Sequence, residues 1–114
     1  MSASDPRIHL LHIRDCCEEL VQCSGLREQG SVPVSILFKA VCRNLEIIGE
    51  AARRFNDAYR LAHAEIPWRA MTDVRNILIH AYDRVAPEIL VGIVRQDIPP
   101  LLTSVKRILG EGKE

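Results

Sequence analysis

Hydrophobic residues recur at every third or fourth position along most of the chain, which is the spacing of one face of an α-helix. The first such stretch covers about residues 6 to 24, and charged side chains occupy the positions between its apolar ones. This pattern predicts one amphipathic helix. Two glycines, a serine and a proline fall within residues 25 to 33, and this composition predicts a loop. The apolar face of the predicted first helix consists of Leu10, Ile13, Cys17 and Leu20.

The second stretch, from about residue 34 to residue 59, repeats the helical period and predicts the longest helix. Glu50 and Arg54 stand four residues apart, in the order that favours an ion pair on a helix. Gly49 lies in the interior of this helix, where a glycine costs about 1 kcal/mol relative to alanine. Either another backbone comes close to Gly49, or the helix tolerates the cost. The apolar positions are Leu37, Val41, Leu45, Ile48, Ala52 and Phe55.

The third predicted helix begins at Pro67, because a proline in the first helical turn loses no hydrogen bond. We expect it to end near Tyr82 or Asp83. Its apolar positions are Trp68, Met71, Val74, Leu78 and Ala81.

Pro87 opens the fourth predicted helix, which is apolar on more than one face. Pro99 and Pro100 should kink or break this helix, and the glycines at 110 and 112 should end it. The surplus of apolar positions fits either a partner subunit or a well-buried fourth helix.

Four helices with short connections predict an all-α fold, an antiparallel four-helix bundle with a kinked or split last helix. The chain has 114 residues, so we expect one domain over residues 1–114. Aromatic residues make up only 4% of the chain, which favours helices packed on helices over a sheet.

Fifteen basic and fifteen acidic residues give a formal net charge of zero. This balance argues against binding to nucleic acid or an anionic membrane by bulk charge, but it leaves room for a local basic site. Most of the basic residues are arginines, which suit bidentate contacts to phosphate. A bias in genomic base composition explains the arginines equally well.

No run of eighteen apolar residues and no leader pattern occurs, so we expect a cytoplasmic protein without a membrane span. The four cysteines show no Cys-x-x-Cys pair and no zinc-finger spacing, so we expect them to be buried thiols. His9 and His12 stand three apart, but no third ligand has convincing spacing, and a metal site there is a remote alternative.

The third predicted helix carries an unusual density of functional side chains: Arg75, Asn76, His80 and Tyr82. On a straight helix Asn76 and His80 lie about 40° apart and Arg75 and Tyr82 about 20° apart, whereas Arg75 and His80 lie about 140° apart. One helix therefore does not aim Arg75 and His80 at one small substrate without a bend or a long reach. We favour a homodimer in which two copies of this helix meet across a two-fold axis.

An arginine and a histidine without an acidic cluster suit metal-independent cleavage of RNA, whose 2′-OH is already a nucleophile. In this hypothesis His80 acts as general base or acid, and Arg75 stabilises the charge on the scissile phosphate. Asn76 orients His80, and Tyr82 stacks on a base or donates to phosphate. No cofactor or metal is needed, and DNA, which lacks the 2′-OH, is not a substrate.

A structural interpretation of the same residues competes with this hypothesis. A histidine or tyrosine on an apolar helix is more often a packed residue with satisfied hydrogen bonds than a catalyst. Arg75 could equally pair with Glu46 or Glu50 of the second predicted helix.

The segment from Arg75 through Asn76 and His80 to Tyr82 resembles the Arg-x4-His-x-Tyr motif of HEPN domains, specifically their HepT-like branch. The segments AVCRNLEIIGEAARRF (40–55), IPW (66–68) and RQDIPPLL (95–102) are also similar to that branch. Ala81, where a polar residue or glycine is common, and the nearby Asp73 are small departures from the family pattern.

The resemblance implies a helical dimer with endoribonuclease activity, in which Arg75 and His80 occupy the catalytic positions. It also implies the toxin role of a toxin–antitoxin pair, with an MNT-type nucleotidyltransferase as antitoxin and Tyr82 as the residue that this partner adenylylates. The alternative within the same fold is a non-catalytic dimeric adaptor or nucleotide-binding subunit for a nucleotidyltransferase.

Overall fold

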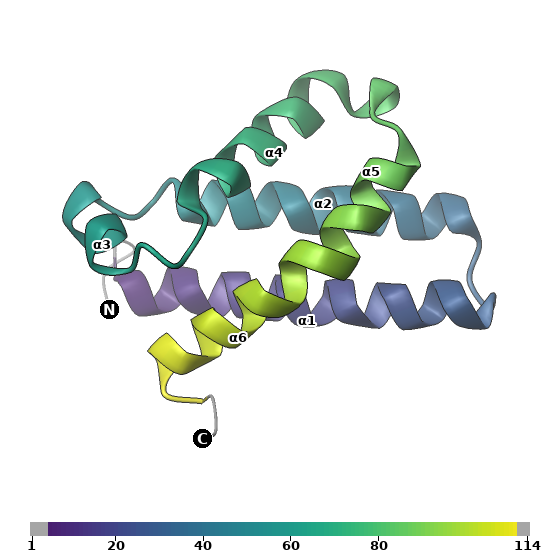
Figure 1. Ribbon diagram of the computed structural model, residues 1–114. Coiled ribbons are helices and arrows are strands. Elements are labelled where there is room, and N and C mark those ends of the chain that lie inside the picture. The colour runs from purple at the N-terminus through teal and green to yellow at the C-terminus, as the bar shows by residue number, and fades with distance from the viewer. Residues whose placement is uncertain (1–4, 112–114) are drawn as a thin grey trace.

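Every regular element in residues 5–111, the part of the chain that the computed structural model describes, is helical. The first two long helices lie side by side and antiparallel, and a third long helix runs back along the second (Figure 1). The elements are α1 (Pro6–Gln29), α2 (Val34–Ala52), α3 (Asp57–Ala62), α4 (Trp68–Ala81), the 3₁₀ turn η1 (Tyr82–Arg84), α5 (Pro87–Gly92), the π-helical turn η2 (Ile93–Asp97) and α6 (Ile98–Leu109).

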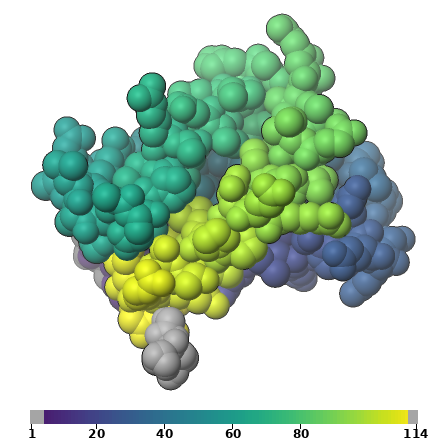
Figure 2. Space-filling model, viewed as in Figure 1, coloured from purple at the N-terminus to yellow at the C-terminus, as the bar shows by residue number. Residues whose placement is uncertain are grey.

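The all-α class is confirmed, and α2 is the central element because it packs against both α1 and α4. The segments α5, η2 and α6 form one rod that crosses α1, and this rod and α4 cover most of the face seen in Figure 2. The predicted apolar faces of the first two helices are confirmed, since nearly all of their positions are buried. The fully buried side chains with the largest volumes are Ile13, Leu20, Ile66, Leu78, Val105 and Cys17.

Helix α1 continues five residues beyond the predicted end at residue 24, so the first half of the predicted loop was wrong. An interior glycine costs only about 1 kcal/mol, and Gly25 does not stop the helix. The helix ends where Gly30 adopts a φ of 69°, a left-handed conformation that glycine adopts without strain. At the other end, Asp5 caps the helix by accepting a hydrogen bond from the Arg7 amide at 2.9 Å.

The predicted helix over residues 34–59 is also wrong at its end, because α2 stops at Ala52 and a separate short helix, α3, follows. Asn56 starts α3, and its Oδ1 accepts a hydrogen bond from the Tyr59 amide at 2.8 Å. The Arg60 guanidinium donates to the carbonyl of Ala52 at 3.1 Å and so satisfies one of the free carbonyls at the end of α2.

We expected a kink or break at the two prolines of the last predicted helix, and the π-helical turn η2 interrupts the α-helix directly before them, while the chain stays helical across both. Pro99 and Pro100 lie in the first turn of α6, where a missing N–H is tolerated. Their rings would crowd the carbonyls of Arg95 and Gln96 in an ordinary α-helix, and these two residues belong to the wider π-helical turn η2. Gly110 ends α6 with a φ of 79°, as predicted, and residue 112 lies outside the described part.

All four cysteines are free and buried, which confirms the prediction for them. Burial raises the pKa of the Cys16 thiol to about 11 and that of the Cys17 thiol to about 12. These thiols are therefore protonated at neutral pH and belong to the core. No helix in the described residues is long and apolar enough to cross a membrane.

Candidate functional site

The predicted site residues lie on α4 and on the turn that follows it. The start of α4 is firmly anchored, because Trp68 Nε1 donates to the carbonyl of His63 at 3.0 Å. The Trp68 ring also packs on Phe55, with 4.7 Å between ring centroids. These contacts anchor the start of α4 to the segment that connects it with α2, and α4 then packs along α2, where it places Arg75.

Arg75 points from α4 towards α2, and its side chain is only 21% exposed. Its Nη2 lies 3.1 Å from Oε1 of Glu50. Its Nη1 donates to Oδ1 of Asn76 at 2.9 Å. The two terminal nitrogens of the guanidinium are thus both bonded, each to a different residue.

Gly49 explains how α2 and α4 come close enough for this contact. A Cβ atom on residue 49 would lie 2.2 Å from the Cβ of Arg75 and 2.6 Å from the carbonyl oxygen of Met71. Only glycine fits at this distance, so close approach of another backbone is the reason for the glycine.

The carboxylate of Glu50 lies among three arginines. Besides Arg75, it pairs with Arg53 at 3.4 Å and with Arg54 at 3.7 Å, and the latter pair confirms the prediction. One negative charge among three positive ones leaves a local excess of positive charge at the end of α2. Glu46, the other predicted partner of Arg75, pairs with Arg43 instead, at 3.4 Å.

His80 and Tyr82 differ from Arg75 because both are exposed. Within residues 5–111 neither side chain forms a hydrogen bond or an ion pair. Helix α4 is uninterrupted from Trp68 to Ala81, so Arg75 and His80 remain about 140° apart around it. Asn76 is bonded to Arg75 and not to His80, the partner that we expected for it.

Tyr82 does not continue the face of α4 as expected. The backbone of Ala81 has φ −153° and ψ 34°, which ends the α-helix, and Tyr82 begins the 3₁₀ turn η1. The expected angle of about 20° between Arg75 and Tyr82 assumed a continuous helix and is therefore wrong. The side chain of Tyr82 is 54% exposed.

Apolar side chains flank His80 on the exposed part of α4. Ile77 is 54% exposed and Ile79 is 45% exposed, although both are large aliphatic residues. Neither isoleucine is among the predicted site residues or on the predicted apolar face. They give the exposed half of α4 an apolar character around its histidine.

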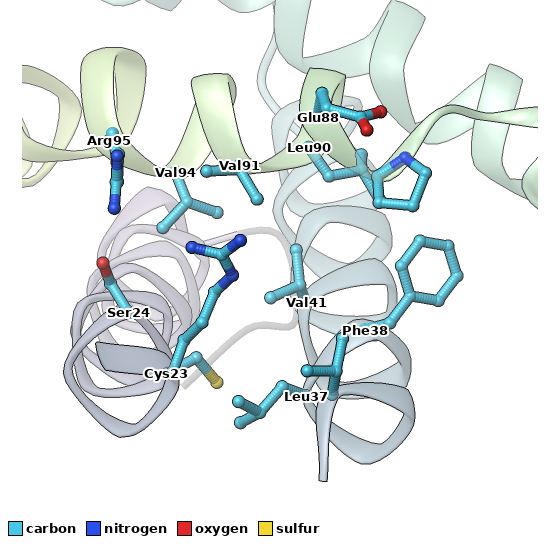
Figure 3. Close-up of a pocket in the computed structure, with 13 residues that line it drawn as sticks. Cys23, Ser24, Leu37, Phe38, Val41, Glu88, Leu90, Val91, Val94 and Arg95 are labelled. Atoms are coloured by element: carbon cyan, nitrogen blue, oxygen red, sulfur yellow. The ribbon is translucent and has the colours of Figure 1, made fainter. Parts of the chain in front are cut away.

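Two cavities lie in other parts of the molecule, and none of the four predicted site residues lines either of them. One, of about 230 Å³, lies between the end of α1, the start of α2 and the α5–η2 segment, with Val41, Leu90 and Val94 on its wall and Arg95 at one side (Figure 3). The other, of about 310 Å³, lies between α2, α4 and the η2–α6 segment. The candidate site is therefore a surface of α4 and not one of these pockets.

His9 and His12, the alternative metal ligands, have ring centroids 6.3 Å apart. His9 is buried against the ring of Phe55, at 5.8 Å between centroids. Nowhere in the described part of the chain do three or more histidine, cysteine, aspartate or glutamate side chains cluster as metal ligands would.

Comparison with known proteins identifies the family. The ribonuclease HepT-like family, within the HEPN superfamily, matches the chain over residues 13–108. The chain belongs to this family, and the resemblance seen in the sequence is confirmed.

Two relatives match over almost their whole length. A protein of Caldanaerobacter subterraneus subsp. tengcongensis named "putative RNase" is 36% identical over 109 residues, covering 95% of this chain and 97% of its own. A protein of Methanocaldococcus jannaschii with the same designation is 43% identical over 107 residues, covering 93% and 98%. A "probable ribonuclease HepT" of Thermococcus cleftensis is 48% identical over 62 residues, covering 54% and 56%. No solved structure shows a significant match to the chain. These relatives support a nuclease role.

Proposed function

We propose that the protein is a cytoplasmic, metal-independent endoribonuclease that cleaves RNA by transesterification at the 2′-OH. The observation that carries the proposal is the fixed position of the Arg75 guanidinium. The guanidinium is held at the surface by Glu50 and Asn76, in a patch with excess positive charge, on the same helix as the exposed His80. A fixed guanidinium can stabilise the charge of a phosphorane, and an exposed imidazole can move protons, once a second copy brings the two groups to one phosphate.

In the proposed reaction His80 of one copy takes the proton of the 2′-OH, and the 2′ oxygen attacks the adjacent phosphorus. Arg75 stabilises the negative charge on the non-bridging oxygens. The bond between phosphorus and the 5′ oxygen breaks, and that oxygen takes a proton from His80 of a second copy. The products are a 2′,3′-cyclic phosphate and a 5′-OH.

We propose a homodimer because Arg75 and His80 of one copy point in different directions. A two-fold axis near α4 would place the histidine of each copy beside the arginine of the other and supply separate base and acid. The exposed Ile77 and Ile79 beside His80 suit such an interface. In each copy the α5–η2–α6 rod would count as the bent fourth helix of a four-helix bundle, with α3 as an insertion.

As regulation, we propose the toxin role with an MNT-type nucleotidyltransferase as antitoxin. The exposed Tyr82 hydroxyl would attack the α-phosphorus of ATP on that partner and release pyrophosphate. The adenylyl group would add bulk and negative charge beside the phosphate site and so exclude RNA.

The experiment compares the wild-type chain with His80→Ala and with His12→Ala, a matched exposed histidine on α1. Each is induced in cells, and total RNA is examined for fragments that end in 2′,3′-cyclic phosphate. We expect growth arrest and fragments with the wild type and His12→Ala, and neither with His80→Ala. Intact RNA with soluble wild-type protein would contradict the proposal.

One observation favours the second candidate, a non-catalytic adaptor for a nucleotidyltransferase. Arg75 already has a partner in Glu50, which is what a purely structural arginine would show. Binding of ATP or of a nucleotidyltransferase by purified protein that leaves RNA intact would support this candidate.

A further inference from the structure

Two consecutive residues of α2 hold the two ends of the Arg75 side chain. Gly49 provides the space for its stem, since any larger residue would collide with the Cβ and Cγ atoms of Arg75. Glu50 holds its head through the contact of 3.1 Å to Nη2. The Nε atom between them is buried, so only the tip of the side chain reaches the surface.

This clamp does more for orientation than for folding. Glu50 is 44% exposed, and partly exposed ion pairs contribute little to stability because water screens them. A free arginine on a helix surface samples many rotamers, and ordering it during the reaction would slow the chemical step. Holding it in place beforehand removes that cost.

The clamp does not neutralise the site. Glu50 also pairs with Arg53 and Arg54, so its single charge is shared among three guanidinium groups. The remaining positive charge still attracts phosphate, although Arg75 is paired.

We infer that Glu50 is a positioning residue for RNA cleavage. It fixes the angle at which the Arg75 guanidinium meets the scissile phosphate and does not itself contact the RNA. This inference rests on the proposed function, and it assigns a role to a residue outside the Arg-x4-His-x-Tyr motif.

The test measures kcat and KM on a short oligoribonucleotide for the wild type, Glu50→Ala, Glu50→Gln and Glu46→Ala. Glu46 is the matched control, because it lies one turn earlier on α2 and, among residues 5–111, its salt bridge is to Arg43 and not to Arg75. We expect Glu50→Ala to lower kcat about 10- to 100-fold with KM changed less than about threefold, because a misplaced arginine affects the transition state.

The glutamine variant separates positioning from folding, because its amide oxygen still accepts a hydrogen bond from Arg75. We expect Glu50→Gln to restore at least about a third of the decrease in log kcat that Glu50→Ala causes. The kcat of Glu46→Ala should stay within about twofold of the wild-type value. Circular dichroism checks that each variant is folded. If Glu50→Ala is not folded, the kcat of Glu50→Gln compared with that of Glu46→Ala decides whether Glu50 has a role.

Three results would overturn the inference. Equal kcat values for Glu50→Ala and Glu46→Ala would show that Glu50 has no role, and a loss confined to KM would show that it acts in binding. A lower KM with unchanged or higher kcat would show that its carboxylate competes with RNA. A wild-type protein that does not cleave would instead remove the proposed function itself, and this inference with it.

Discussion

The two halves of α4 differ in how the rest of the chain holds them. In the first half, Trp68 is bonded to the loop before it, Met71 is buried and Arg75 is clamped by α2. In the second half, Leu78 is buried in the core, but Ile77 and His80 are exposed, and the helix ends at Ala81 in a 3₁₀ turn. Both halves thus contribute to the core, but the first half holds its functional side chain against α2 and the second half exposes its own to solvent.

This difference suggests a division of labour between the two halves. A group that stabilises charge works best when it is fixed before the reaction, because its reorganisation would raise the barrier. A group that moves protons must reach the substrate, and an exposed position allows that. In the proposed reaction the first half supplies the arginine, and the second half presents the histidine to RNA and to a second copy.

The largest expected effects come from removing either side chain, and the two variants should differ in stability. His80→Ala and Arg75→Ala should each lower cleavage about 10²- to 10⁴-fold. His80 is exposed and makes no hydrogen bond within the described residues, so His80→Ala should change the free energy of unfolding by less than about 0.5 kcal/mol. Arg75→Ala should cost more, because its stem packs on Gly49. Urea unfolding of both variants beside an RNA cleavage assay measures the contrast.

The next effect concerns the contact between α2 and α4. Gly49→Ala should lower the free energy of unfolding by about 1–3 kcal/mol, because the added methyl group would collide with Arg75 and with the Met71 carbonyl. Gly25→Ala is the matched control in α1, where an added Cβ meets nothing within 4 Å. It should raise stability by about 0.5–1 kcal/mol through helix propensity. A common sign for the two substitutions would contradict the close approach.

Much of the fold could be predicted from the sequence, because burial on a helix repeats with the helical period. The ends of helices were harder to predict. Gly25 and Gly30 look alike in sequence, yet only Gly30 takes the left-handed conformation that ends α1. Helix α3 was missed because its signal is a single capping side chain, Asn56, inside a continuing apolar pattern.

The candidate site shows the same limit. The density of polar side chains on an apolar helix identified Arg75 and His80 as candidates from sequence alone. Glu46 and Glu50 lie about one helical turn apart on α2, so the position of α4 along α2 decides which of the two Arg75 reaches. Gly49 sets that position, and its role becomes visible only when both helices are in place.

A smaller effect tests whether a second copy covers the exposed side of the second half of α4, around Ile77 and His80. Ile77→Asp should weaken self-association about tenfold or more by placing a charge in an apolar interface, and cleavage should fall with the dimer population. Leu61→Asp is the control, because Leu61 is 80% exposed on α3, away from the site. Sedimentation velocity over a range of protein concentrations measures both. A wild type that stays monomeric throughout, or equal effects of the two substitutions, would contradict the proposed dimer.

The smallest effect concerns the packed interior, where two buried thiols of α1 make the free energy of unfolding depend on pH. Burial raises the pKa of Cys16 to about 11 and of Cys17 to about 12 from an ordinary value of 9.0. An unfolded chain therefore releases these protons more readily than the folded one, and the folded state loses stability as the pH rises above 9. Between pH 7 and pH 9 the loss should be about 0.4 kcal/mol for each thiol, and the slope should be steepest between pH 10 and pH 11 and level off above the folded pKa of each thiol. Urea unfolding of the wild type and of Cys17→Ala at both pH values measures the slope, and the variant should show a shallower one. Equal slopes would mean that Cys17 ionises as easily in the folded protein as in the unfolded chain.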